Sequence, residues 1–358
     1  TALTVAMVLG VISSIAGVLL SPWFLKVMRV PADIHGATLT YCRIYFGGLW
    51  SLILYNMAAG ILRAFGDSKR PLYVLILSSL INVVGDFLLV GVFGMGVAGA
   101  AIATIFAQIV SVIITFKLLA RLEHAGGQIH VWHLHFCAEH MSMMIKIGFP
   151  LALQSMLFPV ANSIVQASVN TMGTDSIAAW SICDKLSMLI WLVADSMGPA
   201  MTTYVAQNLG AGNFKRIRKG MRNAVIMALI TSVVVSVCML IFGRPILRLF
   251  ISNETGHVEE VLGIAYLYLS IMSWFLAILY ALHTYRSALQ GLGNTVVPML
   301  SGIMEFIMRT TAVMLLPRFV GEKGVFYAEV LAWTGATVIL VTSYYAVRRK
   351  IEKKLKIT

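Results

Sequence analysis

Long apolar runs separated by short polar breaks extend along the whole chain. A helix needs about 20 residues to cross the ~30 Å hydrocarbon core of a bilayer, and every run reaches that length. The pattern therefore predicts ten membrane-spanning helices. They cover residues 2–25, 37–62, 71–92, 96–119, 145–171, 177–207, 221–243, 260–285, 296–316 and 326–347.

The composition agrees with this pattern and excludes an ordinary soluble domain. Hydrophobic residues make up 59% of the chain and charged residues only 12%, and the mean hydropathy is +0.86. The ten-residue alternating strands of an outer-membrane barrel are absent from the sequence. We therefore expect an all-α, polytopic membrane protein. Its partner is the lipid bilayer rather than a nucleic acid, despite a net charge of +12.

The longest polar interval lies between the fourth and fifth predicted helices and divides the chain in two. We expect an N-terminal lobe of four helices at 1–120, a connector at 121–142, a C-terminal lobe of six helices at 143–347 and a basic tail at 348–358. We expect the protein to act as a monomer.

Neither the histidines nor the cysteines of the chain form a pattern typical of a metal site. The connector carries Glu139 among several histidines, whose spacing matches no metal-binding motif, so a segment at the membrane surface is the better interpretation. The cysteines are scattered and indicate no disulfide framework. These residues are His130, His133, His135 and His140, and Cys42, Cys137, Cys183 and Cys238.

Basic residues are concentrated in one set of alternate loops. Such loops face the cytoplasm in most membrane proteins, so both chain ends and the connector are predicted to be cytoplasmic. The richer set comprises Arg63, Lys69, Arg70, Lys117, Arg121, Lys146, Lys215, Arg216, Arg218, Lys219, Arg222, Arg286 and the tail. The poorer set comprises Lys26, Arg29, Arg244, Arg248, Arg318 and Lys323.

A repeated turn relates the two halves of the chain. The sequence GILRAFGDSKRPLY at 60–73 aligns with SALQGLGNTVVPML at 287–300. Both turns fall on the same side of the membrane, which predicts two parallel repeats related by an axis along the membrane normal. Secondary transporters are often built from such repeats, with their sites near the midplane. The aligned pairs are Gly66 with Gly293, Asp67 with Asn294, Ser68 with Thr295, and Pro71 with Pro298.

The two halves of this repeat are unequal. Thr1 aligns with about Ala224, so the segment at about 145–220 has no counterpart in the first half. We infer that a hairpin of two helices is missing before the first residue, which leaves four helices against six. The chain is therefore expected to be a fragment of a longer protein.

Five stretches of the chain, the first two of which form one pattern, resemble one known family. RAFGDSKRPL and INVVGDFLLVGVFGMGVAGAAIAT are followed in order by GFPLALQSM at 148–156, VAQNLGAGNFKRIRKG at 205–220 and LQGLGNTVVP. Together they resemble the MATE (multidrug and toxic compound extrusion) family, across essentially the whole chain. That family has a twelve-helix fold of two six-helix bundles, and the resemblance implies that this chain begins at the third helix.

The resemblance also implies a function. Family members are antiporters that export organic, often cationic, compounds in exchange for H⁺ or Na⁺, without a further cofactor. In one subgroup the ion site combines an Asp of the first helix with an Asn, an Asp and a Thr of the fifth and sixth. By motif these last three match Asn82, Asp86 and Thr104, and the first-helix Asp falls outside this sequence.

Asp86 is the only formal charge between Pro71 and Phe116. A charge inside a membrane costs roughly 2.5–3.5 kcal/mol on insertion scales, and such residues are usually functional. Asn82 lies one turn earlier on the same helix face, a spacing that suits a shared cation, a shared proton or a direct hydrogen bond. Burial disfavours the charged form of a carboxylate. A buried Asp86 would therefore be able to take up and release a proton. The alternative is a structural acid satisfied by Asn82 and Thr104.

The second half carries different polar residues at the corresponding place. In the repeat, Asn82 aligns with Arg309 and Asp86 with Val313, whereas Glu305 and Arg309 form an i, i+4 acid–base pair. One interpretation is an ion pair that fixes helix packing. The other is that Glu305 is a switchable carboxylate, released by protonation or by a cationic substrate.

Asp184 and Asp195 are almost three helical turns apart and therefore share one face with Trp191. An acidic, aromatic face suits a cavity for amphipathic cations, although Lys185 offers Asp184 a structural partner. A polar stripe on the preceding helix faces a cavity or another helix rather than lipid, and helix–helix contact explains it equally well. The stripe comprises Gln154, Asn162, Gln166 and Asn170.

The sequence thus predicts a secondary antiporter for drugs or toxic metabolites, with small organic cations as substrates. A related flippase for lipid-linked saccharides is the alternative, although its pyrophosphate substrate would favour a cationic cavity, whereas here acids predominate. A membrane-embedded enzyme would need a clustered catalytic set, which the sequence lacks. A receptor or channel is disfavoured by the two-fold repeat.

Overall fold

The computed structural model describes residues 1–28, 30–121, 123–124, 127–128, 136–251, 258–321 and 323–354. These residues are almost entirely helical. They form two compact units, Thr1–Met143 and Met144–Thr358.

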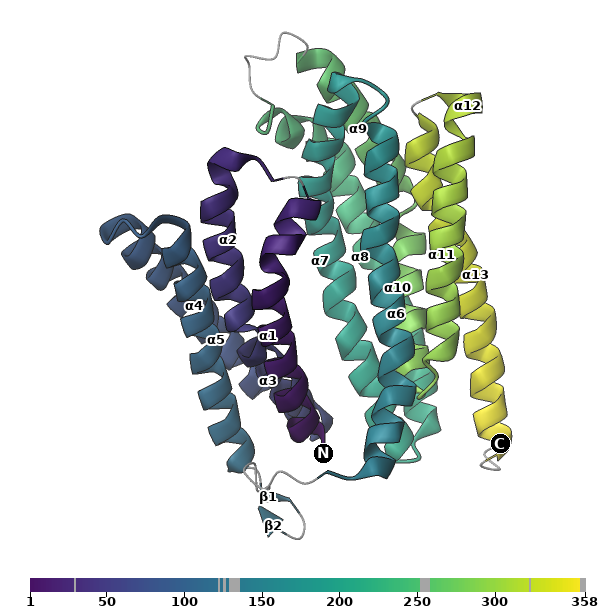
Figure 1. Cartoon of the computed structure of the whole chain (residues 1–358). Helices are drawn as coiled ribbons and strands as arrows, with labels where there is room; N and C mark the ends of the chain where they lie inside the picture. The colour runs from purple at the N-terminus through teal and green to yellow at the C-terminus, as the bar shows by residue number, and fades with distance from the viewer. Residues whose placement is uncertain are drawn as a thin grey trace. The chain divides into compact units, whose positions relative to one another are not determined.

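The first unit is a bundle of long helices followed by a minimal hairpin. Strand β1 (Glu123–His124) pairs antiparallel with β2 (Gly127–Gln128), and the next helix, α6 (Ala138–Val169), begins in this unit and continues in the second. The helices of the first unit are α1 (Ala2–Val27), α2 (Ala32–Gly47), α3 (Leu49–Ala64), α4 (Lys69–Asp86), the π-helix η1 (Phe87–Val92) and α5 (Gly96–Ala120) (Figure 1).

The second unit is a larger helical bundle. Within it α11 lies beside α13, and α7 lies beside α10 (Figure 1). Besides α6, its helices are α7 (Thr174–Gly210), α8 (Phe214–Arg248), α9 (Val258–Trp274), α10 (Leu276–Gly291), α11 (Val296–Leu315), the short α12 (Pro317–Val320) and α13 (Lys323–Lys354).

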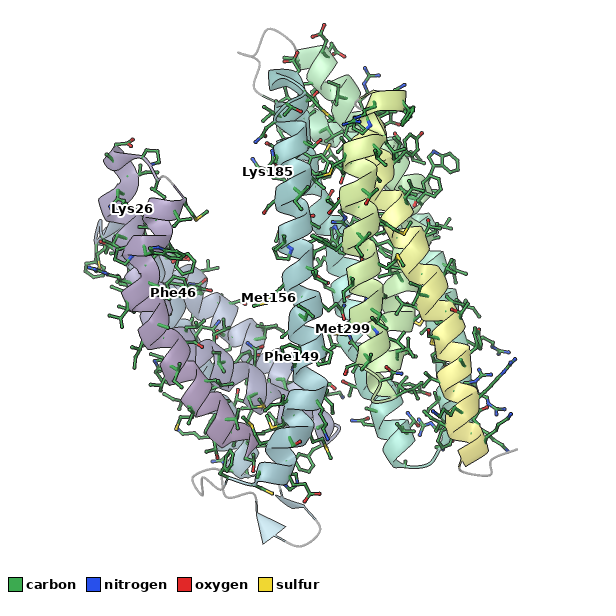
Figure 2. All side chains as sticks on the ribbon, turned by 45° about the vertical axis from the view of Figure 1, so that its right-hand side comes forward. Lys26, Phe46, Phe149, Met156, Lys185 and Met299 are labelled. Atoms are coloured by element: carbon green, nitrogen blue, oxygen red, sulfur yellow. The ribbon has the colours of Figure 1, made fainter. Side chains whose placement is uncertain are left out.

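The predicted spans are confirmed. Within the described residues, nine helices are long and apolar enough to cross a membrane, and the number is ten if the bent pair α9–α10 is one span. Each of the ten apolar runs in the sequence corresponds to one of them. The surfaces agree with a lipid environment, because many large apolar side chains of both units are exposed, such as Leu19 on α1 and Phe242 on α8. Figure 2 shows the side chains of the two units.

Two of the predicted spans are broken near their middle, which hydropathy alone did not indicate. Gly48 separates α2 from α3, and Ile105 of α5 packs where a β-carbon of that glycine would lie. The backbone N–H of Trp50, just after the break, donates to Ser14 Oγ on α1 at 3.0 Å. The hydroxyl of a neighbouring helix thus satisfies a backbone group that the break leaves free.

The second break lies at Phe275, between α9 and α10, whose axes differ by 51°. Here Ser236 Oγ on α8 donates to the backbone oxygen of Ser273 at 2.6 Å. A side chain from a neighbouring helix again pairs with backbone at the break, as unsatisfied polar groups are costly in a membrane.

The repeated turns are built in the same way in both units. Gly66 and Gly293 adopt left-handed backbone, with φ of 88° and 79°, a conformation that glycine tolerates best. The residue after each closes the turn, because Asp67 N donates to Leu62 O and Asn294 N donates to Leu289 O, both at 3.0 Å. The side chains of Asp67 and Asn294 then accept from the backbone N–H three residues on, both at 3.1 Å, as helix caps do.

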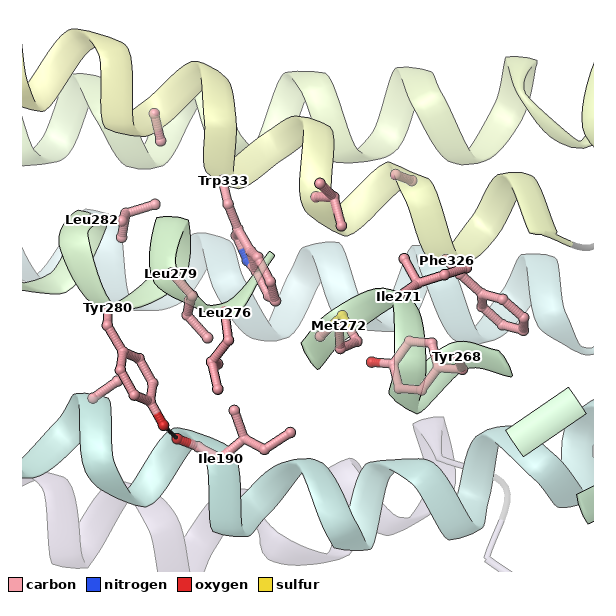
Figure 3. Packing of buried hydrophobic residues seen from close by; sticks show 14 of the residues in the cluster. Ile190, Tyr268, Ile271, Met272, Leu276, Leu279, Tyr280, Leu282, Phe326 and Trp333 are labelled. Atoms are coloured by element: carbon pink, nitrogen blue, oxygen red, sulfur yellow. Dashed lines mark hydrogen bonds between the residues drawn. The ribbon is translucent and has the colours of Figure 1, made fainter. Parts of the chain in front are cut away.

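Large aromatic side chains fill the core of the second unit. Trp333 of α13 is fully buried between α10 and its neighbours, and Tyr280 of α10 donates through its hydroxyl to the backbone oxygen of Ile190 on α7 at 3.2 Å (Figure 3). Tyr268 of α9 packs edge-on against Phe326 of α13, with ring centroids 5.1 Å apart. These contacts hold α7, α9, α10 and α13 around the site described next.

Candidate functional site

The polar residues predicted in the first unit lie together on α4 and α5. Asn82 Nδ2 donates to Thr104 Oγ1 at 3.3 Å, and the Thr104 hydroxyl donates in turn to the backbone oxygen of Ala100 at 3.0 Å. Asp86 follows one turn after Asn82, and its Oδ1 is buried without a hydrogen-bond partner in the described part of the chain. The structure therefore joins Asn82 to Thr104 but leaves Oδ1 of Asp86 unsatisfied within the described residues.

A π-helix begins directly after Asp86. In η1 the N–H of Phe93 donates to Leu88 O, five residues back, at 2.9 Å, instead of four residues back as in an α-helix. Such segments are rare and often mark functional positions. Gly99 on α5 permits close packing here, because a β-carbon at that position would lie 3.1 Å from Leu89. Sequence reasoning missed η1, and the closely spaced glycines from Gly85 to Gly99 are the available signal.

In the second unit, the predicted polar residues line a single cavity of about 1050 Å³. Its walls come from α6, α7, α9, α10, α11 and α13. All six sequence candidates of this unit border it, namely Gln154, Asp184, Trp191, Asp195, Glu305 and Arg309. Asn162, Gln166 and Asn170 of the predicted stripe border it as well.

Glu305 and Arg309 form the predicted pair, within a larger network. Arg309 Nη2 donates to Glu305 Oε1 at 3.2 Å, and Arg286 Nη2 on α10 donates to Glu305 Oε2 at 2.8 Å. Arg309 Nη1 also donates to Asn162 Oδ1 on α6 at 2.8 Å and lies 3.8 Å from Glu329 Oε1 on α13. Four helices of the unit are thus linked through two buried arginines.

Arg286 corrects the sequence interpretation. The basic-residue count placed it in a polar loop, but it lies within α10 with a mostly buried side chain. The predicted span at 260–285 ended one residue too early to include it. Glu329 was missed altogether, although a lone acid in the apolar run VFYAEVLAW is a signal that could have identified it.

Asp184 and Asp195 are exposed to the cavity, in contrast to the buried network. The side chains of Asp184 and Lys185 form no salt bridge, so Lys185 is not the structural partner that the sequence suggested for Asp184. Trp191, between the two acids along α7, contacts Phe158 of α6 edge-on at 5.1 Å and the His283 ring of α10 at 5.4 Å. The cavity therefore combines two carboxylates that form no salt bridge within the described residues with an aromatic wall.

The described residues contain no group of three or more His, Cys, Asp or Glu side chains that could hold a metal ion. Three of the connector histidines, at 130, 133 and 135, lie outside the described residues. His140 is in α6 and exposed.

Comparison with known proteins decides the family. The MatE family model matches residues 1–88 and 150–312. The chain belongs to the MatE family. This MatE chain is similar to the "Probable multidrug resistance protein YoeA" of Bacillus subtilis, with 28% identity over 280 residues, which are 76% of the chain and 59% of the relative.

Two further relatives have different names. The "Probable multidrug resistance protein NorM" of Thermotoga maritima is 26% identical over 292 residues, which are 79% of the MatE chain and 60% of the relative. The "FAD transporter" of Shewanella oneidensis is 26% identical over 261 residues, 70% of the chain and 57% of the relative. The matched stretch therefore spans about three fifths of these proteins.

Solved structures show the same fold. A structure described as the "Outward-facing conformation of a multidrug resistance MATE family transporter of the MOP superfamily" matches with a TM-score of 0.87 and 21% identity, over 100% of the MatE chain and 78% of that protein. A transporter from Pyrococcus furiosus matches with a TM-score of 0.87 and 21% identity, over 98% of the chain and 77% of that protein. The expected transporter fold is confirmed.

Proposed function

We propose that this MatE chain belongs to a secondary antiporter that exports organic cations, such as drugs or toxic metabolites, in exchange for H⁺ or Na⁺. It acts as a monomer in the plasma membrane, without a catalytic role or a cofactor. The helix ends that carry most of the basic residues, and both chain ends, face the cytoplasm.

The observation that carries this proposal is the cavity of the second unit. Asp184 and Asp195 present carboxylates to it that form no salt bridge within the described residues, whereas the two arginines of the network are already engaged by Glu305. Trp191 and Phe158 add aromatic faces. Carboxylates beside aromatic rings attract organic cations through charge and cation–π interaction, and the apolar part of such a compound is removed from water.

Two of the relatives reported above support export of drugs, since both are named as probable multidrug resistance proteins. The relative named as an FAD transporter indicates that substrates differ among similar sequences. We therefore propose the chemical class of the substrate, an amphipathic cation, and not an individual compound.

For the coupling ion we propose a site at Asp86, Asn82 and Thr104. The buried Oδ1 of Asp86 lacks a hydrogen-bond partner in the part of the chain that the structure describes, so a proton or Na⁺ there would satisfy it. Asn82 and Thr104 supply further oxygen atoms from the same face of α4 and from α5, and oxygen is the ligand that such hard cations prefer.

The test is efflux of ethidium from vesicles that contain the full-length protein, with and without an imposed H⁺ or Na⁺ gradient. Gradient-dependent efflux is the expected result. Translocation of a labelled lipid-linked saccharide without ethidium efflux would instead establish the flippase. Loss of efflux in Asp184→Asn and Asp195→Asn, at unchanged abundance in the membrane, would connect the activity to this cavity.

A further inference from the structure

Glu329 is a buried carboxylate that the proposed transport cycle does not yet use. It lies on α13, is 6% exposed, and borders the cavity of the second unit. An acid within a membrane span is retained when it is paired, hydrated or functional. The contacts around Glu329 separate these possibilities.

The two buried glutamates of the network are held very differently. Each oxygen of Glu305 accepts from one arginine, Oε2 from Arg286 at 2.8 Å and Oε1 from Arg309 at 3.2 Å. Glu329 Oε1 lies 3.8 Å from Arg309 Nη1, which is beyond hydrogen-bond range. That Nη1 donates instead to Asn162 at 2.8 Å. Glu305 is therefore fixed as an anion, whereas Glu329 is only loosely paired.

The charges that face Glu329 come from several helices. Arg309 attracts the ionised carboxylate of Glu329, whereas the acids of the same cavity repel it. A proton on Glu329 removes that repulsion and leaves the Glu305 pairs intact. The groups that act on Glu329 are Arg309 and Glu305 on α11, Asp184 on α7 and Tyr268 on α9. His283 and Arg286 on α10, and Lys185 and Asp195 on α7, border the same cavity.

We propose that Glu329 is a proton-exchange site of the second unit, which binds H⁺ in competition with a cationic substrate held at Asp184. This inference rests on the proposed function and adds a coupling residue to it. One proton joins a carboxylate oxygen of Glu329 as one substrate cation leaves the cavity. The negative potential that attracted the substrate falls accordingly, because Glu329 and Asp184 are electrostatic neighbours.

The geometry favours a proton over Na⁺ at this position. Arg309 Nη1 already lies 3.8 Å from the carboxylate oxygen, so a metal ion bound there would face a guanidinium charge at close range. A proton neutralises the carboxylate without placing a second cation beside the arginine. It also allows Arg309 to keep its hydrogen bond to Asn162 on α6.

Infrared difference spectroscopy on the purified full-length protein tests the site without a substrate. Above about pH 6, where exposed carboxyl groups are ionised, the wild type should show the carbonyl band of a protonated carboxyl group. Glu329→Gln should lose this band and Glu329→Asp should shift it. Glu139→Gln, at an exposed acid on α6 outside the cavity, should leave it unchanged. A band that persists unaltered in both Glu329 variants overturns the proposal.

Ethidium binding then tests the competition. In the wild type the dissociation constant should rise as pH falls, by up to about tenfold for each pH unit, with one proton taken up as the dye leaves. Glu329→Gln should make it independent of pH. If this variant does not fold, Glu329→Asp must still move the midpoint, and an unchanged midpoint refutes the competition. Affinity that responds to Na⁺ rather than to pH overturns the choice of ion.

If the carboxyl band depends on Glu329 but no ethidium is bound or transported, the proton site stands and the proposed substrate class fails.

Discussion

Asn82 Nδ2 donates to Thr104 Oγ1 at 3.3 Å and thereby joins α4 to α5, one turn before Asp86, whose buried Oδ1 has no hydrogen-bond partner among the described residues. The Thr104 hydroxyl uses its own proton on Ala100 O, so it has no donor left for Asp86. The hydrogen bond between Asn82 and Thr104 thus does not involve Asp86. Asp86 remains available for an ion from outside the chain.

Replacing Asp86 with Asn tests that role. We expect Asp86→Asn to lower gradient-driven ethidium efflux by at least about tenfold, because an amide cannot exchange a proton and binds Na⁺ more weakly. Efflux is measured in vesicles, with abundance in the membrane determined in parallel. Asp33→Asn, at an exposed acid near the start of α2, is the matched control. Normal efflux by Asp86→Asn would remove this residue from the coupling site.

The charge-swapped variant Glu305→Arg/Arg309→Glu should fail to restore a stable protein. A simple pair would tolerate the exchange, but Arg286 lies 2.8 Å from Glu305 and would face a like charge. The single change Glu305→Gln should cost about 3–5 kcal/mol, since it removes the carboxylate with which both Arg286 and Arg309 form ion pairs. Thermal unfolding of the purified variants measures both effects. Full stability of the swapped protein would show that Arg286 contributes little to the network.

Asp184 and Lys185 should affect substrate affinity in opposite directions. Both are exposed, both border the cavity, and they form no salt bridge with each other. Asp184→Asn should weaken ethidium binding roughly fivefold, and Lys185→Gln should strengthen it by a similar factor, as expected for one unit charge at close range. Fluorescence titration checks the pair. Equal shifts in the same direction would indicate a structural effect and contradict a cation site.

The repeated turns give a prediction on stability. Gly66→Ala and Gly293→Ala should each cost about 1–2 kcal/mol, because both positions have positive φ. Gly148→Ala is the control, since this glycine lies inside α6 with open space around its β-carbon position, and alanine favours helix. Unfolding midpoints are compared among the three. A cost at Gly148 equal to the other two would contradict the role of the left-handed backbone.

The sequence predicted the features that depend on local composition. Apolar runs located all ten spans, and the paired turns at Gly66 and Gly293 predicted a repeat that the structure reproduces bond by bond. It could not predict the features that arise from packing between helices. The break at Gly48 depends on Ile105 of another helix, and Leu89 of η1 packs against Gly99 of α5.

The candidate residues were predicted from isolated polarity in apolar runs, but their partners were not. Glu305 and Arg309 are neighbours on one helix and could be paired from spacing alone. Arg286 and Glu329 meet them only because α10 and α13 pack beside α11. The full set of charged residues in the network can therefore be identified only from the three-dimensional structure.

The positions of the two broken spans bear on the origin of the internal repeat. Gly48 precedes Gly66 by the same number of residues as Phe275 precedes Gly293, so the breaks occupy equivalent positions in the repeat. The residues at these positions differ. The hydroxyl groups that pair with the backbone also differ, since Ser14 accepts from Trp50 N in one unit and Ser236 donates to Ser273 O in the other. We infer from these equivalent positions that an interrupted helix belonged to the repeated unit itself, and that the residues around the break differ between its two copies.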